Sequence, residues 1–142
     1  MPAHADPYGN FNFLVEIDGI ASQGFGEVIL PAASASVIEY REGGEPNTVR
    51  KLPGLIRFDN VILRRAITAS NELYTWWRTV QDGQTSRRSM VVTLLDEGHN
   101  AVKRWRFRNA WPVRYESSAL DAQGSAVVIE TLEVAHEGME VE

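Results

Sequence analysis

A polar run punctuated by glycine and proline, residues 41–54, interrupts a dense series of short segments in which apolar residues recur at every second position. Such alternation is typical of β-strands that bury one face. Apolar residues precede the run at Val37 and Ile38 and resume at Leu55 and Ile56, so both flanks are predicted as strands anchored in a core. Hairpin connections usually take about 2–5 residues, and this run is longer. It is either an arm that contacts a neighbouring subunit or a surface loop with no such role.

The clearest strand signal lies near the N-terminus, where Phe11, Phe13, Val15 and Ile17 precede the turn dipeptide Asp18-Gly19. This pattern predicts a hairpin whose second strand covers residues 21–29. Two glycines inside that second strand predict a bulge or bend. Further strands are predicted over residues 34–41, 55–64, 89–96, 101–109, 113–116 and 126–135.

The hydrophobic period changes once, in the middle of the chain. Four apolar residues there have the spacing of one helical face: Leu73, Trp76, Trp77 and Val80. Ser70 is a suitable N-cap and Gly83 follows the last periodic residue, which predicts one amphipathic helix over residues 71–81. We expect these four side chains to pack the helix onto the sheets, with the Trp pair covering an open end or face.

The predicted fold is therefore mainly β, of the α+β class, in a single domain of 142 residues. It comprises about seven to eight strands, arranged as two packed antiparallel sheets or a small β-barrel. One helix and one long protruding arm, residues 41–54, complete it.

The composition excludes several classes of protein. With 44% hydrophobic and 23% charged residues the chain is in the ordinary globular range. The absence of cysteine excludes disulfides, thiol catalysis and thiolate metal sites. A net charge of −5 disfavours tight non-specific binding to nucleic acid. The N-terminus has neither the basic cluster nor the apolar segment of a secretory signal, so we expect synthesis in the cytoplasm. The sequence has no run of about 18 apolar residues, so we expect no stable membrane insertion.

No pattern in the sequence indicates catalysis or a cofactor. His4, His99 and His136 are far apart and lack metal-ligand spacing. Gly24-Phe25-Gly26 lacks the third glycine of a dinucleotide fingerprint, and no Gly-x-Ser-x-Gly motif occurs. The sequence therefore predicts a protein that is not an enzyme and that has no cofactor or metal site.

One strand carries a row of arginines, Arg104, Arg106 and Arg108, which alternate with Trp105 and Phe107. Alternation places the arginines on one face and the aromatic rings on the other, so they do not form one stacking platform for a nucleic acid. We interpret the arginines as a solvated or subunit-facing charged surface over an aromatic core face.

Several short motifs follow one another in order along residues 6–138. They include Asp6-Pro7-Tyr8, Tyr40-Arg41-Glu42-Gly43-Gly44, Leu52-Pro53-Gly54, Leu63-Arg64-Arg65, Leu73-Tyr74-x-Trp76-Trp77, Trp105-x-Phe107-x-Asn109-Ala110-Trp111-Pro112 and Ile129-Glu130-Thr131-Leu132-Glu133. In this order and spacing, the chain resembles the tail-tube protein family of contractile bacteriophages and phage-tail-like contractile injection systems.

The resemblance implies a structural subunit of an inner tube. Members form hexameric rings that stack into a hollow tube, and contraction of a surrounding sheath drives the tube into a target envelope. The implied partners are further copies of the chain, the sheath protein, baseplate or tube-initiator proteins, and a protein or DNA cargo in the lumen. The implied place of action is a tail-like particle, which is released or acts at a target envelope.

The resemblance also implies that a long loop or hairpin reaches an adjacent subunit or ring. We therefore expect intersubunit contacts from the arm, with residues 42–47 at its tip against the next ring. The arm residues concerned are Arg41, Glu42, Gly43, Gly44, Glu45, Pro46, Asn47 and Thr48. Arg104, Arg106 and Arg108 are expected to face the lumen or a neighbouring subunit.

Two alternatives stay open at this point. One is the tube protein of a related secretion machine, which has the same architecture. The other is a small monomeric β-barrel that binds an apolar ligand in a cavity lined by Trp105, Phe107 and Trp111.

Overall fold

The computed structural model describes residues 9, 12–20, 24–44 and 47–142. The predictions made for Phe11, residues 21–23, Glu45 and Pro46 lie outside the described residues. The elements along the chain are β1 (Phe13–Ile17), β2 (Glu27–Ile29), β3 (Ala33–Tyr40), β4 (Arg50–Phe58), β5 (Val61–Ala66), α1 (Glu72–Gln81), β6 (Arg88–Leu95), β7 (Ala101–Ser117), β8 (Ile129–Ala135) and β9 (Gly138–Val141).

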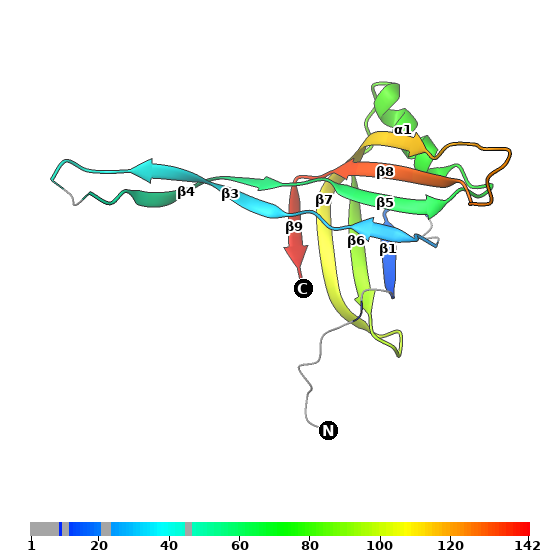
Figure 1. Ribbon diagram of the computed structural model, residues 1–142, viewed down its shortest axis with the longest axis horizontal. Coiled ribbons are helices and arrows are strands. Elements are labelled where there is room, and N and C mark those ends of the chain that lie inside the picture. Colours follow the sequence, from blue (N-terminus) through cyan, green and yellow to red (C-terminus); the bar gives the residue numbers. More distant parts are fainter. Residues whose placement is uncertain (1–8, 10–11, 21–23, 45–46) are drawn as a thin grey trace.

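The body consists of two antiparallel sheets that share β7. The first sheet contains β1, β6, the N-terminal part of β7, and β9; the second contains the C-terminal part of β7, β8, β5 and β2. In Figure 1 the strands of the first sheet run vertically and those of the second horizontally. The predicted mainly β fold with two antiparallel sheets and one helix is confirmed. The sheets do not close into a barrel, because β1 and β2 end the chain of paired strands that the structure describes.

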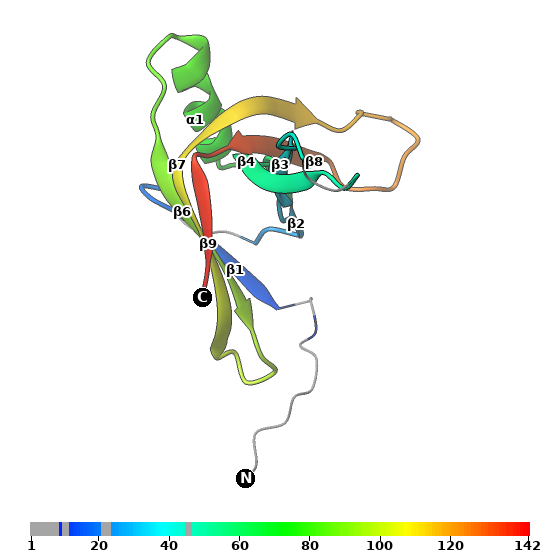
Figure 2. The same cartoon turned by 90° about the vertical axis from the view of Figure 1, so that its left-hand side faces the viewer.

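The strand that joins the two sheets was predicted as two separate strands, and this prediction is wrong. β7 is continuous over 17 residues and curves from one sheet into the other (Figure 2). At the bend Asn109 has a φ of 51°, and its side-chain nitrogen donates to Glu137 at 2.7 Å. The register shifts between Pro112 and Arg114, where proline has no N–H to give to the ladder. The break in the sequence pattern therefore marks a bend.

The predicted N-terminal hairpin is also wrong. Gly19 does form a turn, with a φ of 76°, and Ile20 N donates to Ile17 O at 2.9 Å. However, β1 pairs with β6, whereas β2 pairs with β5 in the other sheet. The turn therefore leads the chain out of the first sheet.

The core lies where the two sheets and α1 meet. Its largest fully buried side chains include Trp76, Phe107, Leu63, Leu73 and Met90. On α1, Leu73 and Trp76 are buried, while Trp77 and Val80 are half-buried. Trp76 Nε1 donates to Ser86 O at 2.7 Å, so its one polar atom has a partner inside the fold.

The ends of the helix differ in part from the sequence-based expectation. The N-cap position is Asn71 instead of Ser70, although the Ser70 hydroxyl accepts a hydrogen bond from Glu72 N at 3.4 Å. Gly83 follows the helix with a φ of 77°, the left-handed conformation in which glycine has no Cβ penalty. No helix among the described residues is long and apolar enough to cross a membrane.

An ion pair lies inside the second sheet. Arg65 on β5 and Glu130 on β8 are opposite each other, each is 3% exposed, and Arg65 Nε is 2.6 Å from Glu130 Oε1. Tyr115 OH donates to the other carboxylate oxygen at 2.8 Å. Burial, followed by the hydrogen bond to Glu130, raises the pKa of Tyr115 above its ordinary value. The ion pair and Tyr115 together link three adjacent strands, β5, β8 and β7, through their side chains.

Candidate intersubunit interface

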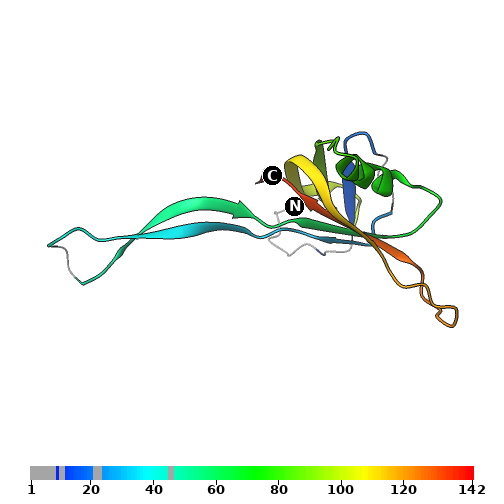
Figure 3. The same ribbon diagram turned by 90° about the horizontal axis from the view of Figure 1, so that it is seen from above.

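The arm is a two-stranded ribbon of β3 and β4 that leaves the body at one end (Figures 1 and 3). Its register continues that of the β2–β5 pair, since Ile29 lies opposite Ile62 and Ala33 lies opposite Phe58. Every residue of β3 is exposed. The expectation that the flanks of the polar run are anchored in a core is therefore wrong. The arm begins at β3 and ends at β4, and the polar run forms only its distal part.

The root of the arm is fixed to the body. The ring of Phe58 lies 5.5 Å from that of His136, which in turn lies 4.9 Å from Phe107. His136 Nε2 is 3.0 Å from Asp59 O, and the Asn60 side chain donates to Glu133 Oε2 at 2.8 Å. These contacts fix the direction in which the ribbon leaves the body.

A β-bulge interrupts the ribbon midway. Ala35 pairs with Ile56 and Val37 with Pro53, so Gly54 and Leu55 together face Ser36. The Ser36 hydroxyl accepts a hydrogen bond from Leu55 N at 2.8 Å. A Cβ on Gly54 would lie 2.3 Å from this hydroxyl and 3.2 Å from Ser36 O. The motif Leu52-Pro53-Gly54 is thus the sequence of the bulge.

Gly54→Val is expected to open the ribbon at the bulge, because the added side chain displaces the Ser36 hydroxyl from Leu55 N. Amide hydrogen exchange should show faster exchange at Leu55 and its neighbours, with the body unchanged. Gly43→Ala is the control, since a Cβ there meets nothing within 4 Å. Equal exchange protection in the Gly54 variant and in the native chain would contradict this account of the bulge.

The arm exposes many large apolar side chains. Leu55 is 82%, Ile56 62% and Val37 60% exposed. Further exposed apolar residues of the arm are Ile38, Tyr40, Val49 and Leu52. Isolated apolar residues are common on protein surfaces, but a contiguous group on a thin ribbon is typical of a surface that another protein covers.

The predicted contact residues at the tip lie at the far end of this ribbon. Arg41, Glu42, Gly43, Gly44, Asn47 and Thr48 are exposed there. Gly44 has a φ of 93°, and Tyr40 OH donates to Glu42 Oε1 at 2.7 Å. This hydrogen bond raises the pKa of Tyr40. The tip lies at the end of the ribbon that points away from the body (Figure 3).

The predicted arginine row lies on the polar face of the first sheet. Arg104, Arg106 and Arg108 are exposed, whereas Phe107 is buried and Trp105 is half-buried on the opposite face. Arg106 pairs with Glu142 at 2.5 Å, and the Arg108 guanidinium lies over Gly138. Glu16 on β1 and Glu140 on β9 lie on this same face, because both belong to the cross-strand row that contains Arg106. The face is thus rich in charges of both signs.

The first sheet has two edge strands, β1 and β9. No strand among the described residues pairs with their outer sides. Successive strands in the order β9, β7, β6 and β1 are antiparallel, so β1 and β9 run in opposite directions. Exposed edges of this kind are templates for pairing with another chain.

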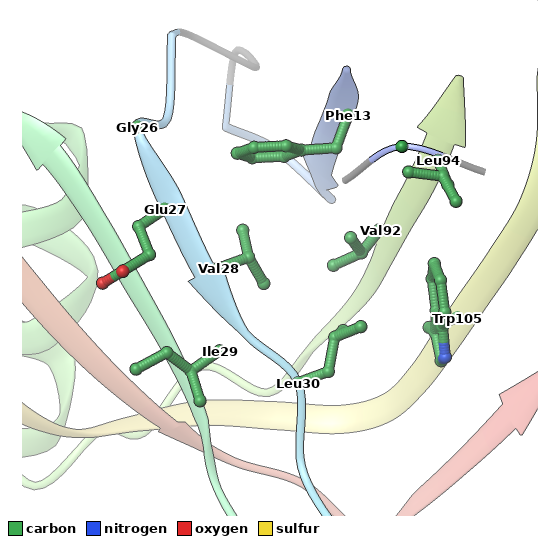
Figure 4. A pocket seen from close by; sticks show the side chains of 10 residues that line it. Phe13, Gly26, Glu27, Val28, Ile29, Leu30, Val92, Leu94 and Trp105 are labelled. Carbon is green, nitrogen blue, oxygen red and sulfur yellow. The ribbon is translucent and has the colours of Figure 1, made fainter. Parts of the chain in front are cut away.

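An apolar groove lies between β2 and the first sheet (Figure 4). It has a volume of about 600 Å³ and is lined mainly by Phe13, Val28, Leu30, Val92, Leu94 and Trp105. Of the three aromatic residues proposed above for a ligand cavity, the groove contains only Trp105. Phe107 is buried in the core, and Trp111 lies beside Arg87. The three rings do not line this groove together.

Comparison with known protein families identifies the family of this chain. The family described as T4-like virus tail tube protein gp19 matches residues 9–140. The chain belongs to this family. It is a tail tube protein, as the sequence motifs implied. The comparison with curated protein sequences found no significant match.

Chains in several solved structures have the same fold. A chain in the structure "Cryo-EM structure of the anti-feeding prophage (AFP) baseplate, 6-fold symmetrised" is 25% identical, with a TM-score of 0.86 over 98% of this chain and 97% of that one. A chain in the sheath–tube complex of the PVC extracellular contractile injection system is 22% identical, with a TM-score of 0.87 over 97% and 93%. Hcp1 from Flavobacterium johnsoniae is 18% identical, with a TM-score of 0.59 over 91% and 93%.

Proposed function

We propose that this tail tube protein forms hexameric rings that stack into the hollow inner tube of a contractile injection system or contractile tail. Its role is structural and not catalytic. The observation that carries the proposal is the combination of an open-edged sheet with one charged face and a long arm whose apolar residues are exposed. Within the part of a single chain that the structure describes, both features are uncovered.

Ring closure is the first consequence. Joining β9 of one copy to β1 of the next continues the antiparallel alternation of the first sheet around the ring, and it removes both free edges. The second sheet occupies the apolar face of the first sheet, so it lies on the outside of such a ring. The charged face then lines the lumen.

The lumen surface follows from this orientation. Arg104, Arg106 and Arg108 face the cargo, together with Glu16 and Glu140. A surface of mixed charge suits the passage of a protein or DNA cargo, because it offers no uniform field of one sign that would retain either. The outer surface contacts the sheath, and an end ring contacts the baseplate or a tube initiator.

The tube of a contractile injection system is favoured over the alternative left open above, the tube of a related secretion machine, for which Hcp1 serves as the comparison. The chain is more similar in fold to the AFP and PVC components, with TM-scores of 0.86 and 0.87, than to Hcp1, with 0.59. The proposed site of assembly is the cytoplasm, before the particle acts at a target envelope.

Removal of the arm tip tests the stacking role. Deletion of residues 43–47 is expected to leave the body folded, because the tip is remote from the core, and to prevent the growth of long tubes. Circular dichroism measures folding, and negative-stain electron microscopy measures tube length against the full chain. The control is a deletion in the loop between β7 and β8, residues 122–124. Tubes of normal length from the arm-tip deletion would contradict the role of the tip in stacking.

A further inference from the structure

We propose that acidic side chains on the two edge strands of the first sheet form an electrostatic barrier to ring closure. The two side chains are those of Glu16 on β1 and Glu140 on β9. This inference rests on the proposed ring and concerns the regulation of its assembly. Free copies repel each other at the surfaces through which they join, so ring closure depends on the ionic strength.

Glu16 and Glu140 lie at the two ends of a single row of residues across the first sheet. Glu16 is opposite Val91 on β6, and Val91 is opposite Arg106 on β7. Arg106 is in turn opposite Glu140. Residues of one such row point to the same face of the sheet, and both glutamates are exposed. Figure 1 shows β1 and β9 at opposite edges of this sheet.

The charge of neither glutamate is neutralised by an ion pair. Among the described residues, neither side chain takes part in an ion pair or a side-chain hydrogen bond. Arg106, which is opposite Glu140, pairs with Glu142 at 2.5 Å. Neither β1 nor β9 contains a lysine or an arginine. The arginines of this face are on β7, so the face is basic in its centre and acidic at both edges.

Ring closure changes the distance between the two carboxylates. Within one copy they are separated by three strand spacings, about 14 Å in all. This distance exceeds the screening length of about 10 Å in 0.1 M salt, so the repulsion within one copy is weak. When β9 of one copy pairs with β1 of the next without stagger, the row continues and the two glutamates are directly opposite. Like charges in that position destabilise strand pairing.

The barrier affects free copies and assembled rings differently. Charged side chains on an edge strand oppose its pairing with another free edge. A copy that joins an existing ring gains stacking contacts as well as the edge contact, and several contacts together overcome a repulsion that one contact does not. The acidic edges therefore favour growth on an existing ring over spontaneous closure in solution.

Charge reversal at either edge tests the barrier in the full chain. Glu16→Lys and Glu140→Lys each convert the repulsive pair into an attractive one. Each variant is expected to reach half-assembly at a protein concentration roughly threefold to tenfold lower than the native chain at low salt. Assembly is measured by sedimentation and by negative-stain electron microscopy, and folding by circular dichroism. The salt concentrations are about 0.01 M and about 1 M NaCl, where the screening lengths are about 30 Å and about 3 Å.

Two controls separate the edge contact from the net charge. Glu97→Lys makes the same charge change in the exposed turn between β6 and β7, and it is expected to have little effect. The double variant Glu16→Lys with Glu140→Lys restores like charges and is expected to lose the gain. Glu16→Lys with Glu97→Lys has the same net charge as that double variant and is expected to retain the gain. At high salt all the variants should assemble as the native chain does.

Equal gains from Glu97→Lys and Glu16→Lys would overturn this inference, because they would indicate an effect of net charge alone. Additive gains in the Glu16 and Glu140 double variant would overturn it as well. In both cases the rings still form, so the proposed function stands. If the native chain and all the variants form no rings at any salt concentration, the proposed function fails, and the inference fails with it.

Discussion

Glu130→Ala is expected to lower the free energy of unfolding by about 3–5 kcal/mol, which is the usual effect of removing one partner of a buried ion pair. The substitution leaves the Arg65 guanidinium 3% exposed without its carboxylate. The two terminal guanidinium nitrogens already lack a hydrogen-bond partner among the described residues, so the surroundings offer little compensation. Chemical denaturation of the monomeric fraction measures the change.

Two comparisons isolate the effect of burial. Glu116→Ala removes an ion pair of the same 2.6 Å length, to Arg114, whose side chains are 66% and 52% exposed. That change is expected to cost less than about 1 kcal/mol. The double variant Arg65→Met with Glu130→Leu is expected to recover much of the loss, because it removes both charges. A Glu130→Ala effect no larger than that of Glu116→Ala would contradict the account.

The same cluster gives a pH dependence in alkaline solution. The pKa of Tyr115 is raised in the folded state, so its neutral form is favoured there. The corresponding stabilisation is complete below about pH 10, the pKa of tyrosine in the unfolded chain, and is lost as the pH rises through the pKa of Tyr115 in the folded state.

Trp76→Ala is expected to lower the free energy of unfolding by about 3–5 kcal/mol, the range for truncation of a large buried aromatic side chain. Trp76 is 1% exposed, and its indole N–H donates to Ser86 O at 2.7 Å. Truncation leaves a cavity between α1 and the sheets and an unpaired carbonyl in the segment after the helix. The thermal unfolding midpoint and the denaturation curve measure the loss.

Trp77→Ala is the matched control for Trp76→Ala. Trp77 is the next residue on the same helix and is only half-buried, so its truncation is expected to destabilise clearly less. Equal losses in the two variants would contradict the assignment of Trp76 as the residue that joins α1 to the core.

The sequence predicted elements better than it predicted their pairing. Alternation located β6 and β8, and the change of period located α1. The same alternation in β3 and β4 was interpreted as anchoring in the core, although Val37 and Ile56 are exposed. A periodic apolar face does not reveal whether the surface that covers it belongs to the same chain or to another copy. The short β9 strand was missed because Gly138-Met139-Glu140-Val141 contains only two large apolar residues.

The sequence contains a pattern that indicates the buried ion pair. Arg65 follows Val61 and Leu63 at every second position, and Glu130 precedes Leu132 and Val134 in the same way. Each charge therefore lies on an otherwise apolar strand face, which indicates a buried partner of opposite sign. Which two strands are neighbours requires the fold, since β5 and β8 are separated by β6 and β7 in the chain.

The most direct test of the central claim is a cryo-electron microscopy reconstruction of the assemblies formed by the full chain at high concentration, or on its baseplate when growth needs an initiator. The account predicts stacked rings in which β9 of each copy pairs with β1 of the next, and in which Arg104, Arg106 and Arg108 face a hollow lumen. Rings joined through other surfaces, or with these arginines on the outside, would contradict it.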